Sequence, residues 1–396
     1  MSVIMDEVQQ GYYTLTYRFR LLDGDEQMLW KTKELYNQIV AFYLDVYFED
    51  LSLGEIPKGQ LLRAMEKLTI PGRDYGDSAV RFPFGKVPAY FRRAAMNSAI
   101  TAAKQLEARG QQWTGKNLNM APVFYKGMYR DLSDKEVELK LWDGKNWSWN
   151  QQKLRGRPWP EEGRQMSPTL ILDDMNRHPM LHVPVQMMTP DTRSIRQKMK
   201  TCVGVCGVCF NNEDTFAVCG IVRRDGSFGR CVFCRGGRQY RRLCQKTLEK
   251  IYRSKQAVGC YGKSNDRSLN RRYWNYLKHL TDFYAHQASC QIISFCQENS
   301  IQVLALPEYE EKYESYVLAK AGRWSPLYLG IRIRKLLEYK AWGAGISIAK
   351  VKYYRSWDEK AEGSGNRHLG TARKIGVQCL VNHGVLRKSE AAEQSG

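Results

Sequence analysis

The chain has 396 residues, 43% of them hydrophobic, and a formal net charge of +20 at pH 7. This length is enough for two or three domains with a sizeable core. No apolar run approaches a membrane span, and residues 1–10 lack the basic and apolar segments of a secretory signal. Composition therefore argues against a membrane or secreted protein, and we expect a cytoplasmic one.

The positive excess lies mostly after residue 200. Residues 223–272 alone hold 15 Lys and Arg against 3 Asp and Glu, interleaved with tyrosines and a tryptophan. Such clustering is typical of a protein that binds a polyanion, most simply a nucleic acid. A solvated basic face without a partner is the alternative, and charge alone does not separate the two.

Residues 12–21 alternate as a strand does, and Asp25 is a candidate N-cap for a helical apolar pattern that starts at Glu26. Two more helical stretches follow, at 58–69 and 88–110. We expect residues 23–115 to form a helical insertion.

Short β-like runs separated by Gly, Asn, Pro and Trp occupy residues 116–195. They can pair with the strand in residues 1–22, so these two segments are expected to form one β domain that the helices interrupt. Residues 190–200 have the appearance of a linker.

The C-terminal half is organised around residues 202–229, where apolar runs alternate with turns. Asp225-Gly226 is a hairpin turn signal, so this stretch predicts a β-meander. A basic helical region follows at 236–299. The remaining pattern predicts alternating strands and helices, at 301–310, 325–342, 346–351 and 368–381. That order, over residues 196–396, is the order of a ribonuclease-H-like domain.

Several stretches of this half resemble the RuvC-type nuclease domain of the transposon-encoded TnpB proteins and the compact type V CRISPR effectors. Their order and spacing carry the resemblance; they are residues 203–205, 211–212, 216–218, 225–226, 268–272, 282–289, 303–308, 324–327 and 339–343. In the N-terminal half, residues 17–21, Gln27, Asn37 and 122–126 resemble the same family. The resemblance implies an α/β multidomain fold, with a ribonuclease-H-like (RuvC) C-terminal domain. It also implies an N-terminal wedge-like β-barrel interrupted by a helical recognition insertion.

In that family three carboxylates hold two Mg²⁺ ions, which prefer oxygen ligands. By resemblance the three positions here are Cys206, Glu308 and His368, so only one carboxylate is kept. A thiol and an imidazole do not build a Mg²⁺ pair, so the resemblance implies a degenerate nuclease that needs no catalytic Mg²⁺. The family's zinc-binding knuckles are also missing from residues 351–367.

Three metal alternatives remain. Cys206-x-x-Cys209 and Cys231-x-x-Cys234 have the internal spacing of zinc knuckles, although both pairs lie in strand-like runs. Cys206, Glu308 and His368 could instead hold a transition metal in the old active centre. Residual Mg²⁺ nuclease activity would need Asp214 or Glu310 as a substitute carboxylate.

The resemblance therefore predicts a bacterial, nucleoid-associated protein that uses a guide RNA to bind double-stranded DNA beside a short flanking motif, without cutting it. Transcriptional repression or recruitment of another factor would follow from such binding. The alternatives are a guided endonuclease with a rearranged metal site, and a zinc-containing transposon protein that binds DNA without RNA.

The guide RNA paired with the target DNA strand would form an RNA–DNA heteroduplex. A channel lined by basic side chains is predicted to hold this heteroduplex by its sugar-phosphate backbone. Its candidate residues are Arg18, Arg20, Lys126, Arg223, Arg224, Arg235, Arg238, Arg241, Arg242, Lys246, Arg267, Arg271 and Arg272. Arg92, Arg93 and Asn97 are the candidates for reading the flanking motif, because these side chains can contact base edges in a groove.

Overall fold

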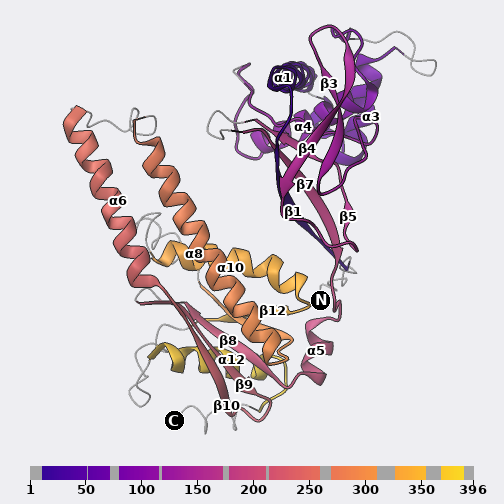
Figure 1. Cartoon of the computed structure of the whole chain (residues 1–396). Coiled ribbons are helices and arrows are strands. Elements are labelled where there is room, and N and C mark those ends of the chain that lie inside the picture. Colours follow the sequence, from indigo (N-terminus) through magenta and orange to yellow (C-terminus); the bar gives the residue numbers. More distant parts are fainter. Residues whose placement is uncertain are drawn as a thin grey trace. The chain divides into compact units, whose positions relative to one another are not determined.

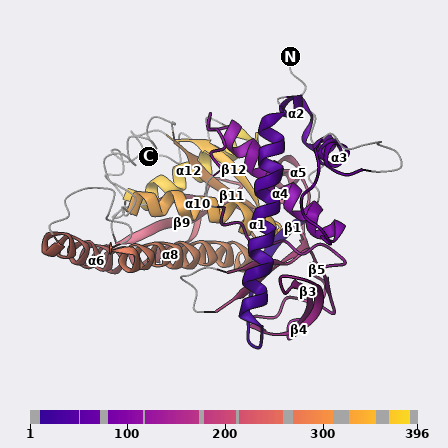
Figure 2. The same ribbon diagram turned by 90° about the horizontal axis from the view of Figure 1, so that it is seen from above.

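The computed structural model describes residues 11–50, 52–71, 80–115, 118–172, 178–210, 214–258, 269–309, 326–353 and 367–387. It divides into two compact units (Figures 1 and 2). One consists of residues 14–187 and the other of residues 1–13 and 188–396. None of the described helices is long and apolar enough to cross a membrane.

The N-terminal unit combines helices with one seven-stranded sheet. The helices are α1 (Glu26–Glu49), α2 (Ser52–Glu55), α3 (Lys58–Thr69) and α4 (Ala89–Glu107). The strands are β1 (Tyr12–Leu21), β2 (Tyr129–Arg130), β3 (Glu136–Trp142), β4 (Trp147–Gly156), β5 (Arg164–Gln165), β6 (Thr169–Ile171) and β7 (Met180–Met188).

The strand order is β2-β3-β4-β1-β7-β5, with β6 paired to β7. The first strand of the chain thus lies between two strands that come after residue 116, which confirms the predicted pairing. Helices and sheet share a core that includes Phe19, Tyr36, Phe91 and Leu139. Closure into a barrel, and the division into a wedge and an insertion, stay predictions.

The sequence also predicted how α1 begins. The Asp25 carboxylate accepts hydrogen bonds from the backbone N–H groups of Gln27 and Met28, at 3.0 and 3.2 Å. These are two of the unpaired donors at the helix start, so Asp25 is the expected N-cap.

The C-terminal unit is built on a five-stranded sheet. Its strands are β8 (Gly204–Phe210), β9 (Thr215–Arg223), β10 (Phe228–Arg235), β11 (Val303–Glu308) and β12 (Ser347–Lys352). The helices are α5 (Ile195–Thr201), α6 (Gly237–Val258), α8 (Arg271–Glu298), α10 (Pro326–Gly343) and α12 (Arg367–Asn382). The predicted order of a meander followed by alternating helices and strands is confirmed.

This sheet has the order β10-β9-β8-β11-β12. β9 runs antiparallel to both of its neighbours, whereas β11 is parallel to β8 and to β12. The predicted hairpin turn joins β9 to β10, where Gly226 takes a positive φ of 79° that suits glycine.

Helices cover both faces of the sheet. Residues of α6, α8 and α10, such as Ile251, Ile292 and Leu337, pack with Cys206 in one core. On the other face, Ile375 and Leu380 of α12 pack with a second core. Figure 1 shows α12 on the side of the sheet away from α8 and α10. β8 and β9 are therefore buried on two faces, which explains their nearly continuous apolar sequences, whereas the edge strand β10 exposes Arg230, Cys231 and Arg235.

The expectation of a linker at 190–200 is wrong at its C-terminal end, where α5 forms. The Ser194 hydroxyl accepts from the Gln197 backbone N–H, and the Gln197 side chain accepts from the Ser194 backbone N–H. This capping box pairs two donors that would otherwise lack partners. Lys198 is buried and donates to the Gly345 carbonyl oxygen at 2.8 Å, which fixes the helix to the turn before β12.

Gly207 permits the close contact between β8 and α12. A Cβ at this position would lie 2.0 Å from the Ala372 carbonyl oxygen.

We expect Gly207→Ala to lower the free energy of unfolding by about 2–3 kcal/mol, because backbone rather than a flexible side chain must move. Thermal unfolding measures this, and the matched control is Gly330→Ala inside α10, where the nearest atom is 3.5 Å away. The control should raise stability by about 0.5–1 kcal/mol. A Gly207→Ala protein as stable as the control would contradict this packing.

Candidate nucleic-acid interface

Helix α6 separates its apolar and basic residues onto two faces. Tyr240, Cys244, Thr247 and Ile251 are buried toward α8, and the Tyr240 hydroxyl lies 3.0 Å from the Thr281 hydroxyl oxygen. The cations occupy the remaining surface, which is exposed or half-buried; they are Arg238, Arg241, Arg242, Lys246, Lys250, Arg253 and Lys255. The predicted channel residues of this helix therefore lie on a solvent-facing basic surface.

Asp214 orients the arginines at the start of α6. Its carboxylate accepts two hydrogen bonds from Arg238, at 3.2 and 2.7 Å, and lies 3.7 Å from the Arg241 guanidinium. These side chains are largely exposed, so the ion pairs add little to stability and a phosphate can compete for the guanidinium groups. Asp214 is thus an arginine partner in this structure, which argues against its use as a substitute metal ligand.

Further channel candidates lie outside α6. Arg271 and Arg272 are exposed in the first turn of α8, and Arg223 and Arg235 are exposed at the ends of β9 and β10. Arg267 lies outside the described residues.

Arg224 makes structural contacts with the end of α5. Its Nη1 donates to the backbone carbonyl oxygens of Met199, Lys200 and Cys202, at 2.6, 3.3 and 3.5 Å. A cation at these last carbonyls also suits the negative end of the α5 dipole. These contacts attach the end of α5, and the place of the exposed Arg224 in the channel stays a prediction.

The structural contacts of Arg224 give a testable pair of variants. Arg224→Ala should lower the free energy of unfolding by about 1–3 kcal/mol, because several carbonyls lose a charged donor. Arg223→Ala is the control, since Arg223 is next to Arg224 in the sequence and its side chain is exposed. Thermal melts and binding assays should show that Arg224→Ala mainly reduces stability. The reverse result, weak nucleic-acid binding with normal stability, would return Arg224 to the channel.

The residues proposed to read a flanking motif are held by partners within the N-terminal unit. Arg93 makes a bidentate ion pair with Glu66, at 2.6 and 3.0 Å. The Asn97 amide donates to the Tyr125 hydroxyl at 2.9 Å, and the Arg92 guanidinium lies 5.6 Å from the centre of the Phe82 ring. Their use in base recognition stays a prediction that requires these contacts to be exchanged.

The other candidates of the N-terminal unit differ in exposure. Arg18 and Lys126 are exposed, whereas Arg20 is half-buried. Their part in nucleic-acid binding also stays a prediction.

Cys206 is sealed inside the C-terminal unit. It is fully buried and, in the parallel register of β8 and β11, lies opposite Leu304 rather than Glu308. Glu308 is four residues further along, or about 13 Å at strand spacing. Hydrogen bonding with Cys206, together with burial, raises the pKa of Cys219 and of Cys296. These two neighbours are therefore neutral thiols in a buried core, and their hydrogen bonds lower the pKa of Cys206 to about 5.

His368 contacts a different cysteine from the one expected. Its Nδ1 lies 3.7 Å from the Cys209 sulfur, and its Nε2 accepts a hydrogen bond from Arg367 at 3.2 Å. Cys209 is three residues after Cys206, and an odd offset on a strand places the two side chains on opposite faces. The predicted grouping of Cys206, Glu308 and His368 is therefore not assembled. From the sequence, strand alternation could have shown only that Cys206 and Cys209 lie on opposite faces of the sheet.

The zinc-knuckle alternative is also not assembled. Cys206 and Cys209 lie on β8 and Cys231 and Cys234 on β10, with β9 between them. Two strand spacings separate the pairs by about 9–10 Å. Within the described ranges no three His, Cys, Asp or Glu side chains form a group that could hold a metal ion. Glu310, the other substitute carboxylate, lies outside those ranges.

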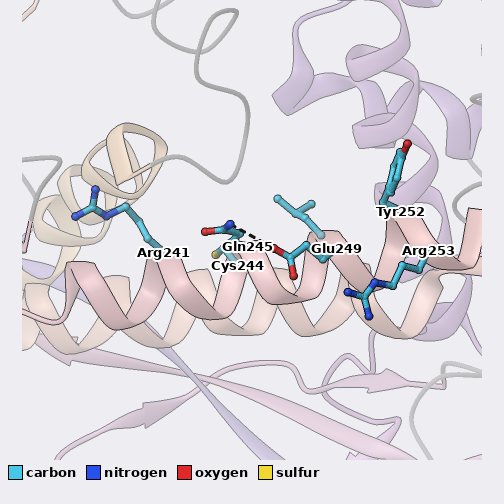
Figure 3. A pocket seen from close by; sticks show the side chains of 7 residues that line it. Arg241, Cys244, Gln245, Glu249, Tyr252 and Arg253 are labelled. Carbon is cyan, nitrogen blue, oxygen red and sulfur yellow. Dashed lines mark hydrogen bonds between the residues drawn. The ribbon is translucent and has the colours of Figure 1, made fainter.

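A hollow along α6 was not predicted. It has a volume of about 560 Å³, and Figure 3 shows its side chains along one face of the helix. The described lining residues are Arg241, Cys244, Gln245, Leu248, Glu249, Tyr252 and Arg253. The four-residue spacing of Arg241, Gln245, Glu249 and Arg253 is the sequence signal that could have identified it.

Comparison with known proteins supports the fold. The model of the Aq_aa04 family matches residues 13–143, and no curated protein matches the chain. A Cas12f1, solved by cryo-electron microscopy in complex with sgRNA and target DNA, is similar over 91% of this chain and 82% of its own. The TM-score is 0.51 and the sequence identity 11%.

A second structure, a CRISPR-Cas12f ternary complex, matches at a TM-score of 0.29 and 12% identity over 86% of this chain and 73% of its own, which is too low a score to indicate a shared fold. The Cas12f1 likeness shows a mixed α/β fold similar to that of a compact type V effector. The fold implied by the sequence resemblance is confirmed at that level.

Proposed function

We propose that this chain binds a guide RNA and uses it to bind a matching double-stranded DNA without cutting it. The observation that carries the proposal is the exposed basic surface of α6 and the start of α8, within a chain that shares the fold of Cas12f1. Cations on a rigid helix can contact the phosphates of a duplex regardless of its sequence, while base pairing with the RNA supplies specificity.

The proposed partners follow from this scheme. A guide RNA is the resident cofactor, and the DNA target carries a short flanking motif, read as a duplex by the N-terminal unit. In this proposal the C-terminal unit is a ribonuclease-H-like domain of the RuvC type, and the N-terminal unit contains the wedge and the recognition helices.

We propose that the protein does not cut DNA because the side chains around the expected metal position do not suit Mg²⁺. The pairing of β8 with β11 puts Cys206 opposite Leu304 in a closed core, and the exposed Glu308 is four residues further along β11. His368 contacts a thiol. Neither apolar nor soft ligands suit Mg²⁺, which takes carboxylate and water oxygens. A protein that binds DNA tightly and leaves it intact would block other proteins, so repression or recruitment is its proposed cellular role.

RNA that remains bound during purification tests the guided part of this proposal. We expect the chain, purified from the cells that encode it, to retain one discrete RNA population through washes at moderate salt. The same preparation treated with ribonuclease should lose sequence-specific DNA binding. Purified protein that binds DNA specifically without RNA would favour the unguided DNA-binding alternative.

A further inference from the structure

Glu249 is an exception on the basic surface of α6. The helix carries seven Lys and Arg side chains but one carboxylate, and that carboxylate lies in the hollow rather than at a helix end. On a surface that contacted only phosphates, it would repel the ligand. A carboxylate in this position suits a ligand that presents a hydrogen-bond donor between its phosphates.

Gln245 is hydrogen-bonded to Glu249. The Gln245 Nε2 donates to the Glu249 Oε1 at 3.3 Å, one turn along the helix (Figure 3). The amide has a second N–H, and a carboxylate accepts several hydrogen bonds, so the pair offers both a donor and an acceptor to a ligand. Leu248 and the buried Cys244, whose pKa is raised by burial, form the less polar part of the lining.

The arginines lie on either side of this pair. Arg241 and Arg253 are twelve residues apart, which is about 18 Å along the helix axis. Two cations this far apart, with a neutral donor and an acceptor between them, match two phosphate strands with a polar groove between them. The wide, shallow minor groove of an A-form helix is such a surface, and it displays ribose 2′-hydroxyls.

We propose that the α6 hollow recognises the 2′-hydroxyl of the RNA strand in an RNA–DNA heteroduplex. Glu249 accepts the hydrogen bond of the hydroxyl, and Gln245 donates one to its oxygen. Arg241 and Arg253 contact phosphates on the two sides of the groove. This inference rests on the proposed function and deepens it, because it assigns the residues that distinguish an RNA strand from a DNA strand.

Three probes of one sequence test the inference with the full-length chain. They are an RNA–DNA heteroduplex, the same heteroduplex with 2′-fluoro groups in the RNA strand, and a DNA duplex. The 2′-fluoro strand keeps the A-form but has no donor for Glu249. The wild type should bind it about tenfold more weakly than the unmodified heteroduplex, the effect of one hydrogen bond to a charged group.

Glu249→Ala should bind the 2′-hydroxyl and 2′-fluoro heteroduplexes equally well. Its affinity for the DNA duplex should stay the same or rise, because a repulsive charge is gone. Glu298→Ala is the control, since it removes the same charge from an exposed position at the end of α8 and should keep the tenfold difference.

The outcomes separate this inference from the proposed function. Wild-type protein that binds both heteroduplexes equally, or Glu249→Ala protein that keeps the tenfold difference, would overturn the role of Glu249 alone. Wild-type protein that binds no heteroduplex would overturn the proposed function, and the inference with it.

Discussion

Replacing Arg241, Arg242, Arg271 and Arg272 together with alanine should reduce affinity for nucleic acid about 100-fold or more at low salt, since each loses one phosphate contact. All four side chains are exposed on α6 and α8. The loss should be similar for every target sequence, because contacts to phosphates carry no sequence information.

Salt dependence gives the sharper readout for this variant. Each phosphate contact contributes about 0.9 to the slope of log K against log salt concentration on B-form DNA, so four lost contacts should lower the slope by about 3–4. The control variant replaces four cations of the same unit outside α6 and α8, namely Lys335, Lys350, Lys352 and Lys374. It removes the same charge and should leave the slope nearly unchanged. Equal slopes for the wild type and the α6–α8 variant would show that the channel assignment is wrong.

Introducing a carboxylate at position 206 should destabilise this protein. Cys206→Asp places a charge in a fully buried position among neutral thiols and aliphatic side chains. We expect a loss of about 3–5 kcal/mol in the free energy of unfolding, because thiols are weak donors and do not replace the water that a buried carboxylate loses. Cys206→Ala, which leaves only a small cavity, should lose about 1 kcal/mol.

The pH dependence of this loss identifies its cause. Burial raises the pKa of a carboxyl group, so the folded Cys206→Asp protein binds more protons than the unfolded chain above pH of about 4. Its stability should therefore fall as pH rises from about 4 and should recover partly in acid. Chemical unfolding at several pH values measures both effects. A Cys206→Asp protein that is stable at neutral pH and binds Mg²⁺ would mean that position 206 is accessible.

Elements were easier to predict than contacts. The alternating and helical periods, the Asp25 cap and the Asp225-Gly226 turn are local signals, and each predicted its element. The α5 helix was missed because its capping box and buried Lys198 lie in a short, polar segment that looks like a linker.

The candidate site was predicted less well because it depends on strand register. Cys206 was matched to a family position by sequence order, but the side chains that meet are fixed by the pairing of β8 with β11 and by the face each residue occupies. Nothing in the local sequence predicts that Leu304 lies opposite Cys206. The contacts of Arg224 with α5 were missed for a related reason, since its carbonyl partners lie more than twenty residues earlier in the chain.

Binding and integrity of a matched DNA in one reaction test the central claim most directly. The purified protein–RNA complex would be incubated with Mg²⁺ and two labelled DNA duplexes. One duplex contains a sequence that matches the bound RNA, next to a library of flanking sequences. The other contains a scrambled sequence. We predict RNA-dependent retention of the matched duplex alone, with every strand intact after hours. Cutting of the matched duplex would contradict the proposed loss of nuclease activity, and equal retention of both duplexes would contradict guided binding.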